Sequence, residues 1–141
     1  MTADEVHLAA SHGLLRRFQK LRGNRQDRMQ RHVSLWDNEI EGACAELAFC
    51  KLRGVYWSGV SGLRAKDGGA VDVRWTRHHG TGGLIVYPQD DDAAVIVLME
   101  GAAPVYSVVG WMRAAQAKRP EWLKDFGYLV ARQYLKAYPR R

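Results

Sequence analysis

The stretch KDGGAVDVR, residues 66–74, gathers charged side chains around a pair of glycines. Asp67 and Asp72 carry carboxylates, the hard oxygen ligands that Mg²⁺ and Mn²⁺ prefer. Arg74 stays protonated and can stabilise negative charge with two parallel hydrogen bonds. In AVDVRWT, apolar residues alternate with Asp72, Arg74 and Thr76, as expected for a strand with one face in the core. The other face of this strand is therefore a candidate site.

The spacing of the two carboxylates leaves two interpretations open. On a fully extended chain, Asp67 and Asp72 are about 16 Å apart, too far to share one ion. Gly68 and Gly69 permit a sharp turn or bulge that could swing Asp67 back towards Asp72. Asp-Gly is also a common turn sequence, and Asp72 and Arg74 could be an ordinary pair on the wet face of a strand.

A third carboxylate, Glu46, precedes this stretch in IEGACAELAFCKLRG. This segment predicts a helix from about residue 34 or 35 to residue 53, ended by Gly54. Glu46 shares one helical face with small residues, beside the apolar stripe that should pack on the sheet. It could point along the sheet towards the candidate strand, or out to solvent.

The segments GACAELAFCKLRGVYW, KDGGAVDVRWT, LIVYPQDD, AVIVLMEG and YSVVGWM resemble the small PD-(D/E)XK nuclease-like proteins of phage and bacterial genomes, over about residues 36–122. The resemblance implies a restriction-endonuclease-like fold. It matches Glu46 to the helix Glu of that family and Asp67 to its first Asp. Asp72 and Arg74 occupy the D/E-x-K positions, with Arg74 in place of the usual Lys.

The resemblance implies a metal-dependent nuclease that hydrolyses DNA phosphodiester bonds, an endo- or exodeoxyribonuclease. Asp67, Asp72 and Glu46 would bind Mg²⁺ or Mn²⁺, and Arg74 would stabilise the negative charge of the transition state. Because Arg74 cannot act as a base, an alternative is a nuclease-fold protein without activity that binds nucleic acid or a host protein.

Basic residues concentrate at the two ends of the chain. Residues 1–34 hold seven Lys/Arg against three Asp/Glu, residues 112–141 hold eight against two, and the stretch between holds six against ten. This distribution fits a polyanion held by the flanks, although solvated faces on terminal helices would look the same. The candidate DNA contacts are Arg16, Arg17, Lys20, Arg22, Arg25, Lys51, Arg77, Lys118 and Arg119. The sequence leaves open the form of the DNA and whether the chain forms a homodimer.

Hydrophobic periodicity predicts the elements that position these residues. A helix is expected over about residues 4–22, and five short strands are expected in VYWSGV, AVDVRWT, GLIVY, AAVIVLME and VYSVVGWM. Because the linker PQDDD is too short for a parallel crossover, the strands between residues 83 and 98 should be antiparallel neighbours. AAVIVLM is apolar on both faces, so it should lie in the centre of the sheet. Helices should follow in WMRAAQAK and in EWLKDFGYLVARQYLKAY.

These elements predict an α/β fold, with a mixed, largely antiparallel central sheet of about five strands flanked by helices. The chain has 141 residues, the size of one ordinary domain. That domain would comprise a basic N-terminal helix (residues 1–34), a helix-and-sheet core (35–111) and a basic C-terminal helical region (112–141).

Cys44 and Cys50 are too few and too widely spaced for a zinc site and are expected to be free thiols. Without an apolar run or a signal-peptide pattern, we expect a cytoplasmic protein of a bacterial or phage-infected cell, not bound to a membrane.

Overall fold

The computed structural model describes residues 1–23, 34–59, 63–64 and 70–139. Two long helices form one layer: α1 (Ala3–Arg22) and α2 (Leu35–Arg53). The first turn of α1 is closed by a capping box, in which Thr2 Oγ1 accepts from Glu5 N–H and Glu5 Oε2 accepts from Thr2 N–H. The helix α2 ends at Gly54, whose φ of 63° is the left-handed conformation that glycine adopts most easily. Both helices are confirmed close to their predicted bounds.

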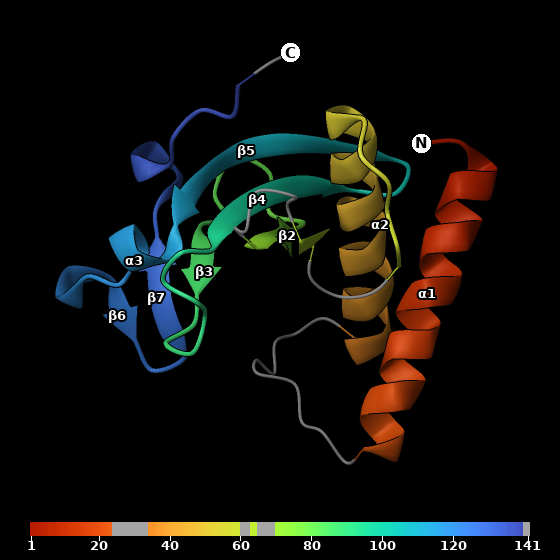
Figure 1. Cartoon of the computed structure of the whole chain (residues 1–141), viewed down its shortest axis with the longest axis horizontal. Helices are drawn as coiled ribbons and strands as arrows, with labels where there is room; N and C mark the ends of the chain where they lie inside the picture. The colour runs from red at the N-terminus through yellow and green to blue at the C-terminus, as the bar shows by residue number, and fades with distance from the viewer. Residues whose placement is uncertain (24–33, 60–62, 65–69, 140–141) are drawn as a thin grey trace.

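A four-stranded sheet lies beside α2, in the order β1-β2-β4-β5 (Figure 1). Its strands are β1 (Leu63–Arg64), β2 (Ala70–Thr76), β4 (Val95–Ala102) and β5 (Val105–Arg113). The strand β4 pairs in parallel with β2 and antiparallel with β5. The prediction that AAVIVLM forms the central strand, buried on both faces, is confirmed, because Ile96, Val97, Leu98 and Met99 are each at most 1% exposed.

A second sheet of three strands covers the opposite face of the first, in the order β3-β7-β6 (Figure 1). It contains β3 (Leu84–Val86), β6 (Leu123–Lys124) and β7 (Gly127–Val130), all antiparallel. The short helix α3 (Ala114–Ala117) and the 3-10 turns η1 (Pro120–Trp122) and η2 (Arg132–Tyr134) complete this side.

The general α/β class is confirmed, but the prediction of one five-stranded central sheet is wrong. VYWSGV forms no strand over residues 55–59. β3 does not pair with β4; it leaves the first sheet and pairs with β7. The connection between the parallel strands β2 and β4 therefore includes β3, a strand of the second sheet. The structure has neither a crossover helix nor a tight hairpin here.

The expected long C-terminal helix is also absent from the described residues, since β6, β7 and two 3-10 turns occupy this part of the chain. Gly127 has a φ of 142°, and a Cβ there would lie 2.8 Å from the carbonyl oxygen of Val86. The close contact with β3 and the backbone pairing of β7 outweigh the apolar spacing, which suits a helix equally well. The four residues of α3 are the helical part that is confirmed.

Candidate functional site

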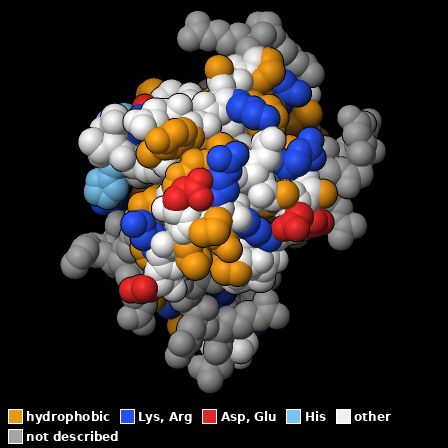
Figure 2. Space-filling model, turned by 90° about the vertical axis from the view of Figure 1, so that its left-hand side faces the viewer, with side chains coloured by type: hydrophobic (Ala, Val, Ile, Leu, Met, Phe, Trp, Pro, Cys, Tyr) orange, Lys and Arg blue, Asp and Glu red, His pale blue; other side chains and the backbone are white. Residues whose placement is uncertain are grey.

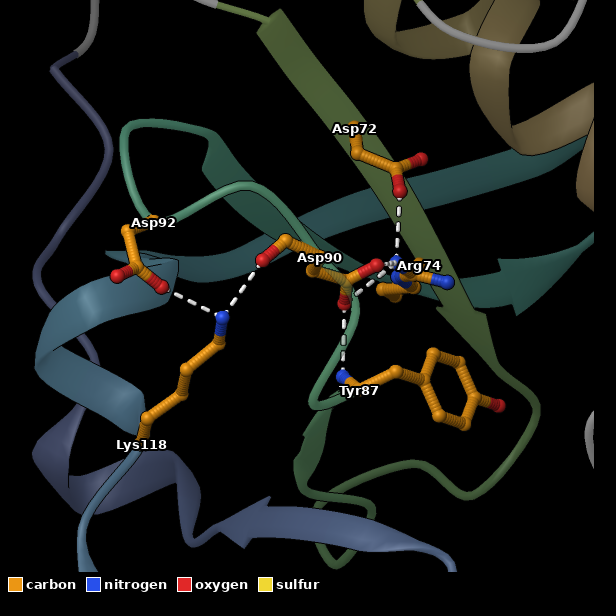
Figure 3. A network of polar contacts seen from close by, with 6 residues as sticks. All are labelled: Asp72, Arg74, Tyr87, Asp90, Asp92 and Lys118. Carbon is orange, nitrogen blue, oxygen red and sulfur yellow. Dashed lines mark hydrogen bonds and ion pairs between the residues drawn. The ribbon is translucent and has the colours of Figure 1, made fainter.

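The two faces of β2 belong to different environments. Val71, Val73 and Trp75 pack with Ala45 and Phe49 of α2. Because side chains alternate along a strand, Asp72 and Arg74 extend from the other face, towards the loop that follows β3 (Figure 3). The predicted division of this strand into a core face and a charged face is therefore observed.

Arg74 is the centre of a polar network on that charged face. Its Nη2 lies 2.7 Å from Asp72 Oδ2 and 3.0 Å from each carboxylate oxygen of Asp90. Its guanidinium carbon lies 5.0 Å from the centre of the Tyr87 ring. Two carboxylates thus converge on one cationic nitrogen atom (Figure 3).

Asp90 and Lys118 extend the network to the second sheet and α3. Asp90 is 9% exposed, and its Oδ2 accepts a hydrogen bond of 2.7 Å from the Tyr87 backbone N–H. Lys118 Nζ donates to the Asp90 carbonyl oxygen at 2.6 Å and to Asp92 Oδ1 at 2.5 Å. These bonds fix the loop between β3 and β4 against β2 (Figure 3). Sequence reasoning does not place Asp90 in the site; the run of three Asp residues is the one signal that points to it.

Glu46 does not join this network. It lies on α2, which packs on the opposite face of the four-stranded sheet. Its carboxylate accepts bonds of 3.0 and 2.7 Å from Arg16 and a bond of 3.3 Å from Trp57 Nε1. The Arg16 side chain is 11% exposed and also donates to the Gly59 carbonyl oxygen. Glu46 is therefore occupied in joining α1 to α2, and the predicted metal role for it does not fit this geometry.

The metal hypothesis now depends on Asp72 together with Asp67, which lies outside the described residues. Within residues 1–23, 34–59, 63–64 and 70–139, no three His, Cys, Asp or Glu side chains are grouped so that they could hold a metal ion. Asp72, whose side chain is 37% exposed, and Asp90 have oxygen ligands that suit Mg²⁺, but Arg74 stands between them. The described part of the site is thus a pair of carboxylates that share one guanidinium.

Most of the predicted DNA contacts on the two long helices are engaged within the protein. The ion pairs are Arg16 with Glu46, Lys20 with Glu39, and Lys51 with Glu5 at 2.8 Å. Arg17 is 9% exposed. A phosphate would have to displace these carboxylates or reach a buried guanidinium, so this side of the molecule is a poor match for a polyanion.

The remaining predicted contacts differ in exposure. Lys118 belongs to the Arg74 network, and Arg25 lies outside the described residues. Arg22 and Arg77 are exposed, and Arg77 lies 5.5 Å from the ring centre of Trp75. Arg119 is 58% exposed and its guanidinium lies 5.1 Å from the ring centre of Trp122. The exposed cations are therefore scattered over several elements.

The comparisons with known proteins give no family for this chain. No protein-family model, no curated protein and no solved structure matches it. The resemblance to PD-(D/E)XK nucleases therefore stays a prediction, and the function has to be argued from the geometry alone. No described helix is both long enough and apolar enough to cross a membrane.

Proposed function

We propose that this chain binds nucleic acid through its C-terminal face, by which we mean the exposed surface of residues 111–139. The observation that carries the proposal is the arrangement of exposed charge on this segment. Its exposed cations are Arg113, Arg119, Lys124 and Lys136, and its exposed carboxylates are Glu121 and Asp125. Cations in excess on one surface attract a phosphate backbone and release its counterions on binding.

Aromatic side chains accompany these cations. Lys136 Nζ lies 5.0 Å from the ring centre of Trp111, and Arg119 lies over Trp122. Figure 2 shows the left-hand side of the molecule as drawn in Figure 1, the side on which β6 lies. Lys and Arg side chains are interleaved there with hydrophobic ones. Cations beside aromatic rings are typical of surfaces that hold phosphates and stack on bases. The surface therefore favours nucleic acid over a polyanion without bases.

Paired charge variants test where nucleic acid binds. Arg113→Gln with Lys124→Gln removes two cations from the C-terminal face, whereas Arg22→Gln with Lys51→Gln removes two from the helical layer. We expect the first pair to weaken binding of a labelled DNA oligonucleotide and to reduce the salt dependence of its binding constant. The slope should fall by about one unit for each phosphate that the variant no longer neutralises.

The second pair should bind like the parent, because Lys51 already pairs with Glu5. Fluorescence anisotropy over a series of salt concentrations measures both the binding constant for DNA and its salt dependence. The proposal is wrong if the parent binds no DNA, or if the helical pair weakens binding as much as the C-terminal pair.

Metal-dependent hydrolysis of DNA is a second candidate, supported by the convergence of Asp72 and Asp90 on one cationic nitrogen. Asp72, with Asp67 from the neighbouring segment, would hold Mg²⁺ or Mn²⁺, which lowers the pKa of bound water. Arg74 would turn from the carboxylates to a phosphate oxygen and stabilise the added negative charge. This candidate requires the Arg74 ion pairs to open when metal and DNA bind.

A cleavage assay on supercoiled, linear and branched DNA with Mg²⁺, Mn²⁺ or EDTA tests this candidate. Asp72→Asn should abolish metal-dependent cutting, and Asp125→Asn, an exposed carboxylate on the β6–β7 turn, should leave it unchanged. DNA left intact by the parent in every metal would reject hydrolysis and leave the binding proposal untouched.

A further inference from the structure

A pocket of about 340 Å³ opens between β5, α3 and the two 3-10 turns. Its lining residues come from several short elements between residues 112 and 136 that meet on the C-terminal face. They are Met112, Gln116, Arg119, Glu121, Trp122, Tyr134 and Lys136. Pockets that hold small organic ligands begin at about 300 Å³, so this one suits a single nucleotide better than a larger group.

Aromatic rings form two walls of the pocket. The centres of the Trp122 and Tyr134 rings are 5.4 Å apart, and their planes are tilted by 44°. Trp122 packs against the core cluster around Leu84 and Ile96, which fixes its ring, while Tyr134 is 52% exposed. A fixed ring beside an exposed one offers a planar ligand a surface on which to stack.

Polar and charged groups complete the lining. Arg119 is 58% exposed, and its pairing with Glu121 is loose, at 3.9 Å. Lys136 Nζ donates a hydrogen bond of 3.1 Å to the neutral amide oxygen of Gln116. Two cations therefore line the pocket with one carboxylate, and the Gln116 amide can donate to or accept from the edge of a base.

We infer that this pocket holds one unstacked nucleotide of a single strand. The base would stack on Tyr134 and Trp122, and the phosphates on either side would contact Arg119 and Lys136. A base inside a duplex is covered by its neighbours and cannot present its face in this way, whereas a base in a single strand can. The inference rests on the proposed function and adds the class of nucleic acid and the position at which a base is held.

Two oligonucleotides of equal length separate stacking from charge: a thymidine oligonucleotide and an abasic one that keeps the phosphates. We expect the parent to bind the thymidine oligonucleotide at least about fivefold more tightly than the abasic one. Stacking of one base on an aromatic side chain strengthens binding by at least about this factor. Tyr134→Leu should reduce this preference, and Tyr134→Phe should keep it. Tyr56→Leu is the matched control, since Tyr56 is 89% exposed and follows α2, away from the pocket.

The outcomes distinguish the inference from the proposed function. Equal binding of both oligonucleotides by the parent would overturn the stacking pocket and leave phosphate binding intact. Loss of the preference in Tyr56→Leu as well would overturn the assignment to Tyr134. If free dTMP competes as effectively as the oligonucleotide, a single strand is the wrong ligand. If neither oligonucleotide binds, the proposed function fails and the inference fails with it.

Discussion

The carboxylate of Glu46 lies between two helices, where it accepts two hydrogen bonds from Arg16 and one from Trp57. The sequence correctly predicts that position 46 is helical and beside small residues, but its partner comes from a position 30 residues earlier. Periodicity specifies the face on which a side chain lies and not which distant side chain it meets. On the sequence alone, the charge of Arg16 suits DNA binding as well as it suits an ion pair.

Glu46→Gln should lower the free energy of unfolding by about 2–4 kcal/mol, because it leaves the largely buried Arg16 guanidinium without its anion. Chemical denaturation followed by circular dichroism measures the change. Glu121→Gln is the control, since that exposed pair is loose and should contribute little. A metal role for Glu46 would instead leave apo stability unchanged and abolish stabilisation by Mg²⁺.

Glu100 should make the stability depend on pH. The hydrogen bond from Arg132, aided by the Gly80 backbone N–H, lowers the pKa of Glu100 below its ordinary value of 4.5. The ionised form is therefore favoured by folding, and its stabilisation is present above pH 4.5 and is lost as the pH falls through the folded pKa. Glu100→Gln should melt at a lower temperature than the parent at about pH 7, and the two melting temperatures should converge in acid. A constant difference between neutral and acidic pH would contradict this account.

At the scale of elements, the two long helices come close together at Gly13. A Cβ at this position would lie 2.6 Å from the Glu39 carbonyl oxygen and 2.7 Å from the Ile40 Cα, both in the backbone of α2. The hydrophobic spacing within α1 predicts the helix. It does not predict the contact at Gly13 that fixes α1 against α2, because that contact involves a second segment of the chain. Likewise, the alternation in AVDVRWT and the apolar run AAVIVLM predict β2 and β4, because both signals are local.

The elements that the sequence misplaces depend on pairing between distant segments. β7 forms because β3 offers it a partner, although Leu84 pairs with Val130, far along the chain. The apolar residues of this segment suit either period, and the choice is made by backbone hydrogen bonds that no local pattern encodes. Asp90 and Asp72 are likewise brought together by contacts between segments that are separated in sequence. Their proximity therefore cannot be predicted from local patterns.

A pair of glycine substitutions tests the helix contact. Gly13→Ala should destabilise the protein even though alanine is the better helix former, since its methyl group would meet rigid backbone. Gly42→Ala, also within a helix, meets nothing within 4 Å and should stabilise the protein by about 0.5–1 kcal/mol. Denaturation midpoints of the two variants give the comparison; an equal gain in both would mean that the helices do not approach closely at Gly13.

At the scale of the whole molecule, β4 joins two cores. Val97 and Met99 pack towards α2 in one cluster, and Ile96 and Leu98 pack towards the second sheet in another. Neither layer can separate from the four-stranded sheet without exposing one face of the same strand. If the chain is a single domain, as the sequence predicts, both layers should unfold together with this one central element.

Unfolding should accordingly be one cooperative transition. We expect tryptophan fluorescence and far-ultraviolet circular dichroism to give the same denaturation midpoint, since the tryptophans lie in both layers and the long helices in only one.

Leu98→Ala, in the core that faces the second sheet, should lower both midpoints together and reduce the free energy of unfolding by about 2–5 kcal/mol. Leu123→Ala is the control, because Leu123 is 53% exposed on β6 and its truncation should change little. If the fluorescence midpoint shifted in Leu98→Ala while the helical signal stayed in place, the second sheet would unfold on its own. The C-terminal face proposed to bind nucleic acid would then be a separate unit.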